Sequence, residues 1–133
     1  MPKFEPNDFS INQAWIVFQL SDAPITTEEE GDFHILGLMD AASCYMLGTE
    51  FVSVTNSEAS QFQAKHLLRT GQSQSKQLPR QLIIHKKVEA TAFTQEAKAL
   101  GIESVHAASN EIWPIIREAV EGFRQHISGG HEQ

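Results

Sequence analysis

Three carboxylates stand where side chains from distant parts of this chain could converge on a metal ion. Asp22 follows a strand-like run, Glu58 lies near the start of a helix-like segment, and Glu111 lies near the start of the last one. Mg²⁺ prefers several hard oxygen ligands, and a metal ion held in this way can activate a water for hydrolysis. If the three acids meet in space, they predict a one-metal hydrolase or nuclease that acts on nucleic acid or another phosphoester.

Each of these acids also fits a structural role. Glu58 comes three residues after Thr55, which is the spacing of a capping box at a helix start. Glu111 lies in a first helical turn, where the helix dipole favours negative charge. Asp22 belongs with Glu28–Glu30 to an acidic loop. Because every candidate has this simpler explanation, we expect no metal site and no cofactor.

The six histidines are scattered, and no two have the i, i+4 spacing of a helical metal site. His85 and His106 each end a strand-like run, which makes them candidates for a ligand site at the carboxyl edge of a sheet. A histidine in that position is more often a partly buried structural residue. The single cysteine, Cys44, has no basic neighbour that would lower the pKa of its thiol. The sequence contains no GxGxxG, Walker A, GxSxG or CxxC motif.

The charge balance bears on the kind of partner. Ten Lys and Arg against seventeen Asp and Glu give a net charge of −7. Nucleic-acid affinity comes largely from cations that neutralise phosphates, so this balance argues against general nucleic-acid binding. Four of the cations are partly grouped in the sequence: Lys76, Arg80, Lys86 and Lys87. A group of this kind is usually part of an ordinary solvated edge.

Composition also bears on the compartment. No stretch approaches the ~20 apolar residues that a membrane span requires, and the polar N-terminal residues 1–12 lack the apolar core of a signal peptide. One cysteine allows no internal disulfide. We expect a soluble cytoplasmic protein that does not bind membranes.

Apolar patterning predicts five strands and three helices. The strands are expected at residues 14–20, 33–39, 44–54, 81–85 and 102–106, and the runs 21–32 and 71–79 are expected to be loops. Within the third strand, Gly48 is expected to mark a β-bulge, and Asp40 begins a turn before it. The second and third strands are too close in sequence for a helical crossover, so they should pair antiparallel.

The helices have clear start and stop signals. The first is expected to run from Thr55 to Leu68 or Arg69 and to be closed by Gly71, and the second from Val88 to Leu100, stopped by Gly101. The third should reach Ile127, with Pro114 in its first turn. One stripe at helical spacing should be buried on that helix: Ile112, Ile116, Val120, Phe123 and Ile127. We expect a flexible segment at 1–12, a single domain at 13–127 and a disordered tail at 128–133.

This order of three strands, a helix, a strand, a helix, a strand and a helix resembles the ribonuclease H-like fold. The resemblance implies an α/β domain with a five-stranded mixed sheet in the order 3-2-1-4-5 and three helices. The second half of the chain, beginning LPRQLIIHKKVEATAFTQEAKALGI, also resembles an uncharacterised bacterial domain of this architecture.

The resemblance further implies where catalytic acids would stand: in the first strand, in the first helix, at the end of the fourth strand and near the start of the last helix. The first strand, AWIVFQL, contains no acid, and the fourth ends in His85, followed by Lys86 and Lys87. Glu58 and Glu111 stand near the other two positions. We therefore expect a non-enzymatic domain that binds a protein partner or assembles with itself, through exposed edge strands or the last helix with Trp113. The metal-dependent hydrolase remains the alternative.

Overall fold

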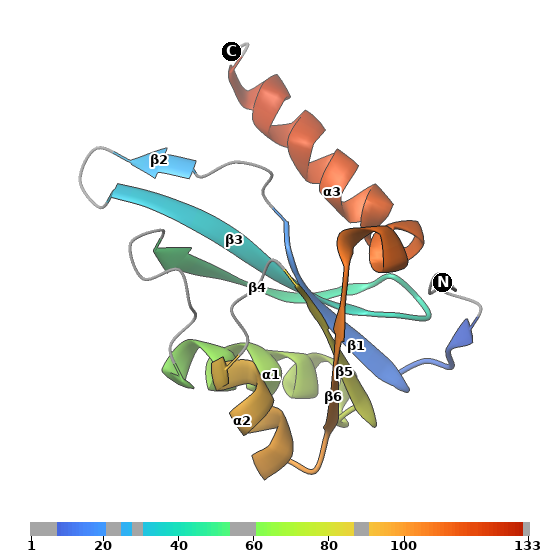
Figure 1. Cartoon of the computed structure of the whole chain (residues 1–133). Coiled ribbons are helices and arrows are strands. Elements are labelled where there is room, and N and C mark those ends of the chain that lie inside the picture. The colour runs from blue at the N-terminus through green and yellow to red at the C-terminus, as the bar shows by residue number, and fades with distance from the viewer. Residues whose placement is uncertain (1–7, 21–24, 28–30, 54–60, 87–90, 132–133) are drawn as a thin grey trace.

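The structure is a computed structural model that describes residues 8–20, 25–27, 31–53, 61–86 and 91–131 (Figure 1). Its strands are β1 (Ala14–Gln19), β2 (Ile25–Thr27), β3 (Gly31–Asp40), β4 (Met46–Ser53), β5 (Gln81–His85) and β6 (Glu103–Ala107). Its helices are α1 (Gln61–Ser75), α2 (Thr91–Ala99) and α3 (Ser109–His131). All five predicted strands are present at these positions, with ends that differ by a few residues.

The strands form one mixed sheet in the order β4-β3-β1-β5-β6. β3 is antiparallel to both β1 and β4, whereas β5 is parallel to β1 and to β6. The predicted order 3-2-1-4-5 and the ribonuclease H-like fold class are therefore confirmed. The short strand β2 pairs with the first residues of β3, in a stretch that we predicted to be loop. Its three residues are too few to show a period in the sequence.

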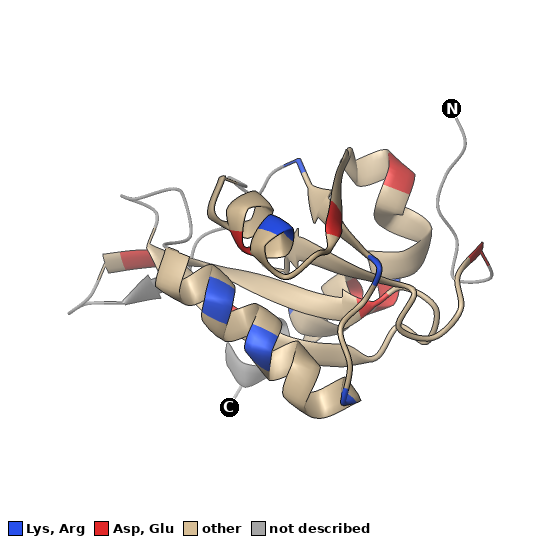
Figure 2. Ribbon diagram, turned by 90° about the horizontal axis from the view of Figure 1, so that it is seen from below, with Lys and Arg blue, Asp and Glu red and all other residues tan. Residues whose placement is uncertain are grey.

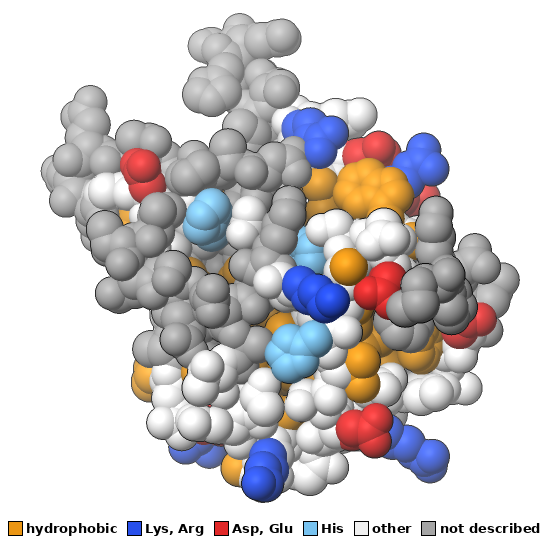
Figure 3. All heavy atoms as spheres, in the orientation of Figure 1, with side chains coloured by type: hydrophobic (Ala, Val, Ile, Leu, Met, Phe, Trp, Pro, Cys, Tyr) orange, Lys and Arg blue, Asp and Glu red, His pale blue; other side chains and the backbone are white. Residues whose placement is uncertain are grey.

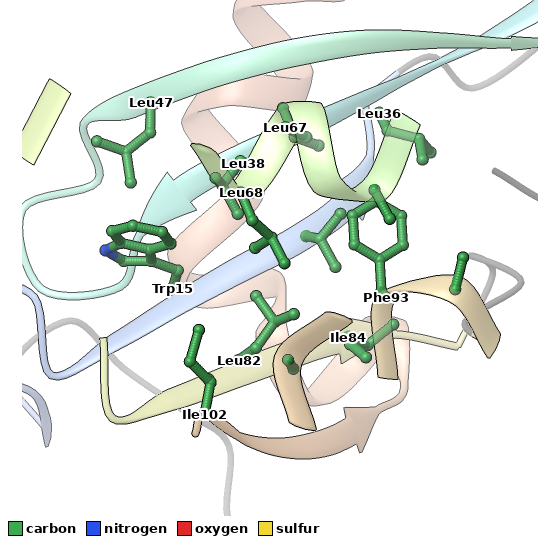
Figure 4. Close-up of a cluster of buried hydrophobic side chains, with 14 of the residues drawn as sticks. Trp15, Leu36, Leu38, Leu47, Leu67, Leu68, Leu82, Ile84, Phe93 and Ile102 are labelled. Carbon is green, nitrogen blue, oxygen red and sulfur yellow. The ribbon is translucent and has the colours of Figure 1, made fainter. Parts of the chain in front are cut away.

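Helices cover both faces of the sheet, with α1 and α2 on one face and α3 on the other (Figure 1). The strand β1 is buried on both sides, because Trp15 and Val17 belong to the apolar cluster under α1 and α2, whereas Ile16 and Phe18 belong to the cluster under α3. Figure 4 shows the first cluster, in which Trp15 lies near Leu38, Leu47 and Leu68. The near-continuous apolar run of β1 is thus explained by burial on two faces.

The end of α1 differs from the prediction. The helix continues through Gly71 to Ser75, and the chain then turns at Lys76, which has a left-handed φ of 70°. Gly71 is a contact residue, because a Cβ built there would lie 2.8 Å from Leu38 Cδ2 and 2.8 Å from Trp15 Cζ3. The prediction that Gly71 ends the helix is therefore wrong. A glycine stands there because α1 packs closely against the sheet at this position. The predicted cap at Thr55 and Glu58 lies outside the described residues.

The predicted stop of α2 at Gly101 is confirmed. Ile102 N–H donates to the Ala97 carbonyl at 2.8 Å, and Gly101 N–H donates to the Lys98 carbonyl at 3.1 Å. These two bonds define a Schellman motif, which requires a left-handed residue at its centre. Gly101 has a φ of 76°.

Helix α3 begins earlier than predicted, so Pro114 lies in its second turn. A proline there has no N–H to donate to the Asn110 carbonyl, and its ring disfavours a straight helix. Figure 1 shows the first turn of α3 at an angle to the rest. Ile112, Ile116 and Val120 of the predicted stripe are buried, whereas Phe123 is only partly buried.

Candidate functional site

The carboxyl ends of β1 and β5 lie side by side, and the resemblance implies a catalytic acid in the first of these strands and another at the end of the second. The residue that ends β5 is His85, which is 3% exposed and lies on the face of the sheet covered by α3. Its Nε2 is 2.7 Å from Oγ of Ser109, the first residue of α3. Its Nδ1 receives a long hydrogen bond of 3.5 Å from the Gln19 N–H at the end of β1. The imidazole therefore joins three elements.

These two partners indicate which nitrogen carries the proton in the neutral imidazole. A backbone N–H directed at Nδ1 makes that nitrogen an acceptor, so in the neutral ring the proton is on Nε2 and is donated to Ser109 Oγ. Activation of a serine nucleophile requires the reverse, with a free Nε2 lone pair facing the hydroxyl. The contact between His85 and Ser109 thus serves to fasten the start of α3 to the sheet.

The structure does not bring His85 and His106 together. In the parallel pairing of β5 and β6, His85 is opposite Ala107, and Ile84 is opposite His106. Successive side chains of a strand point to opposite faces. His106 therefore lies on the side of α1 and α2, where it is exposed, whereas His85 is buried under α3.

Glu111 has a structural partner. Its Oε1 accepts a hydrogen bond of 2.9 Å from the N–H of Ala108, the residue that precedes α3. This bond is the backbone half of a capping box. Asp22 and Glu58 lie outside the described residues, so their convergence with Glu111 stays a prediction. Among the residues that the structure describes, no three His, Cys, Asp or Glu side chains are placed to hold a metal ion.

The predicted partial group of cations is spread over the molecule. Arg80 precedes β5 and Lys86 follows it, so their Cα atoms are roughly 20 Å apart at the rise of an extended strand. Lys76 directly follows the end of α1, and Lys87 lies outside the described residues. These cations do not form one compact patch.

A polar cluster at the opposite edge of the sheet centres on Asp40, which is 2% exposed. Its carboxylate accepts three hydrogen bonds of 2.8 Å, from Asn12 N–H, Ser43 N–H and Ser43 Oγ. The predicted turn at Asp40 is confirmed by the last two bonds. Its bond to Asn12 links residues 28 positions apart, and no local pattern signals it. A depression of about 320 Å³ lies beside this cluster, lined in part by Tyr45 and Leu47.

Cys44 lies in the same turn, with a left-handed φ of 61°. Burial raises the pKa of its thiol, and the nearby carboxylates of Glu118 and Asp40 raise that pKa further. The thiol is 3.7 Å from the Ile115 carbonyl. A raised pKa lowers the fraction of nucleophilic thiolate at neutral pH, so Cys44 is a poor nucleophile.

The exposed apolar side chains do not merge into one surface on the face shown in Figure 3, where those of the described residues form small separate areas. The large exposed ones include Tyr45, Phe51, Phe62 and Trp113. None of the helices in the described part of the chain is both long and apolar enough to cross a membrane.

Comparison with known proteins gives a likeness of fold alone. No family model and no curated protein matches this chain, so nothing supports the resemblance to an uncharacterised bacterial domain. The chain is similar to the HTLV-2 integrase catalytic core domain, solved with magnesium in a dimeric form, with 8% identity, 82% of each chain covered and a TM-score of 0.52.

A second similar structure is the simian T-cell lymphotropic virus intasome in complex with the PP2A regulatory subunit B56 gamma. The identity is 11% and the TM-score 0.51, over 72% of this chain and 34% of the other. This chain thus spans about a third of that protein. The architecture of this chain is that of the retroviral integrase cores, a ribonuclease H-like fold.

Proposed function

We propose that this chain is a non-enzymatic ribonuclease H-like domain that acts by binding a protein, either a partner or another copy of itself. The observation that carries the proposal is the position of His85. The imidazole occupies the end of β5, where the resemblance implies a metal-binding carboxylate, and it is buried and hydrogen-bonded to Ser109. An imidazole engaged in this way carries no negative charge that could offset the charge of a metal ion.

The neighbouring groups support the same proposal. Two divalent cations bring about four positive charges, which several carboxylates must offset. β1 carries no acid between Ala14 and Gln19, and the exposed Lys86 follows His85 directly. Glu111 already accepts the Ala108 N–H. The groups at this edge therefore favour contacts that hold β1, β5 and α3 together over the binding of metal ions.

The alternative is a metal-dependent hydrolase that uses Asp22, Glu58 and Glu111. It is favoured by the likeness of fold to an integrase core that was solved with magnesium. Under this alternative, one ion would be held by three acids from different parts of the chain. The two hypotheses differ in whether the chain binds Mg²⁺ or Mn²⁺ at all.

A cleavage assay separates the two. The purified protein is incubated with an RNA–DNA hybrid and with single strands in Mg²⁺ or Mn²⁺, and metal binding is followed in parallel by calorimetry. We expect no cleavage above background and no saturable metal binding. Saturable binding with cleavage that Glu58→Gln and Glu111→Gln abolish would overturn the proposal. Glu103→Gln, at the start of β6 on the opposite edge of the sheet, is the matched control.

The protein-binding half of the proposal needs its own measurement. Sedimentation velocity over a wide range of concentrations shows whether the chain associates with itself. A reversible shift to a larger species supports self-assembly, whereas a constant monomer leaves a partner protein as the proposed form of binding.

A further inference from the structure

Helices α1 and α2 form a cationic layer on a chain that is otherwise acidic. Its exposed cations are Lys65 and Arg69 on α1 and Lys98 on α2, and the exposed Lys76 directly follows α1. The same two segments contain one carboxylate, Glu96, which is 8% exposed and accepts a hydrogen bond of 3.1 Å from Gln61 Nε2. Figure 2 views this layer from below and shows blue bands on both helices. The other Asp and Glu among the described residues lie outside α1 and α2.

An exposed aromatic ring lies among these cations. Phe62 is 77% exposed, and its ring stacks on His66 with centroids 6.3 Å apart and an interplanar angle of 7°. His66 Nδ1 is in turn 3.0 Å from Glu50 Oε2 on β4, which holds the stacked pair in place. The stack with His66 leaves most of the Phe62 ring open to solvent, so the ring presents apolar area that a partner can cover.

The spacing places the ring and the cations on one side of α1. Phe62, Lys65 and Arg69 are separated by three and four residues, so they are neighbours on the helix surface. The buried residues of α1, which include Leu67, Leu68 and Gly71, face the sheet. The outer face of α1 therefore combines one aromatic anchor with two cations, and the neighbouring helix α2 carries the exposed Lys98.

We infer that this face, made by Phe62, Lys65, Arg69 and Lys98, docks an acidic protein segment that carries an apolar side chain. The inference rests on the proposed function and names the chemistry of the partner. Carboxylates of the segment would pair with the three cations, and its apolar side chain would cover the ring of Phe62. Aromatic residues and arginine are enriched at the centres of protein interfaces.

The same face is poorly suited to nucleic acid. Duplex DNA carries one negative charge per ~1.7 Å of axis, whereas α1 with its 15 residues is only about 22 Å long. A polyanion that continues past the layer meets a surface on which, among the described residues, acids outnumber Lys and Arg. Base stacking also needs successive aromatic platforms, and the described residues of the layer offer the single pair Phe62 and His66. A short acidic protein segment, in contrast, need not extend beyond the cations of the layer.

Fluorescence anisotropy with defined probes tests the inference on the full chain. The probes are a fluorescein-labelled peptide of repeating Glu-Glu-Leu units, its Lys-Lys-Leu counterpart, and an oligothymidylate with the same number of negative charges. We expect saturable binding of the acidic peptide that weakens as salt is added, and weaker binding of the other two probes. Absence of saturable binding, or tighter binding of the oligothymidylate, would overturn the inference.

Paired charge reversals locate the site. Lys65→Glu with Arg69→Glu should weaken the acidic peptide by about tenfold, since each lost pair also becomes a repulsion. The control, Arg80→Glu with Arg117→Glu, changes the net charge equally at exposed cations outside the layer, so an equal loss there would refute the site. If the first variant does not fold by circular dichroism, Lys65→Gln with Arg69→Gln replaces it. The nuclease assay is independent, so failure of one proposal is distinguished from failure of the other.

Discussion

The effect of Gly71→Ala on stability distinguishes two explanations of why glycine stands at this position. If Gly71 only ended or interrupted a helix at the surface, alanine would stabilise the protein, because alanine is better than glycine in a helix by about 1 kcal/mol. In the structure, Gly71 is buried within α1. The added Cβ would lie 2.8 Å from Leu38 Cδ2 and 2.8 Å from Trp15 Cζ3, and both of these side chains are 0% exposed.

The magnitude follows from these contacts. Overpacking a well-packed core typically costs about 1–3 kcal/mol. The indole of Trp15 is rigid and also donates a hydrogen bond to Asn12 Oδ1 at 3.2 Å, so it cannot move away without loss. We take the upper end of the range and subtract the gain in helix propensity. The expected result for Gly71→Ala is a net destabilisation of about 2 kcal/mol.

Urea denaturation followed by circular dichroism and tryptophan fluorescence measures this change. Gly122 on α3 is the matched control, because a Cβ there would meet nothing within 4 Å, so Gly122→Ala should stabilise by about 1 kcal/mol. The comparison is valid if the two variants keep the m-value of the wild type. If Gly71→Ala raised the midpoint as Gly122→Ala does, the close contact between α1 and the sheet would be refuted.

Three further substitutions or treatments have expected outcomes. Asp40→Ala leaves three donors without their acceptor and should lower the unfolding free energy in urea by about 3 kcal/mol. Phe123→Ala should lower the unfolding free energy by only about 1–2 kcal/mol, because the ring is partly buried. Ile116→Ala should lower it by more, because Ile116 is 2% exposed. An equal loss in the two variants would contradict this ranking. Because burial, then Glu118 and Asp40, raise the pKa of Cys44, iodoacetamide should label the native thiol more slowly than the urea-unfolded one. The contribution of the protonated Cys44 thiol to the unfolding free energy is fully present below the pKa of the thiol in the unfolded chain. It is lost as the pH rises through the raised pKa of the folded protein.

Features set by neighbours in the chain could be predicted from the sequence. The apolar run at residues 14–20 predicted the strand β1, and Gly101 predicted the stop of α2. The bulge expected at Gly48 is confirmed, because Leu38 pairs with Gly48 and Met39 with Met46, which leaves Leu47 as the extra residue. Each of these features depends on steric limits of a few consecutive residues, and such limits are written in local sequence.

The candidate site could be predicted only in part. The spacing of Glu111 from the start of the last helix predicted a role in its first turn, and the structure shows that cap. The sequence also placed His85 at the end of a parallel strand. It could not show that His85 and His106 lie on opposite faces, because that depends on the register between β5 and β6.

Contacts between distant segments were decided by the tertiary structure alone. Gly71 looks the same in sequence whether it ends a helix or lets α1 approach Trp15, and only the docked helix distinguishes these roles. The bond from Asn12 to Asp40 spans 28 residues, and the cationic layer exists because two helices far apart in the chain cover the same face of the sheet. Local sequence determines which conformations each segment prefers, whereas packing determines which side chains meet, because the free energy of those contacts depends on the whole fold.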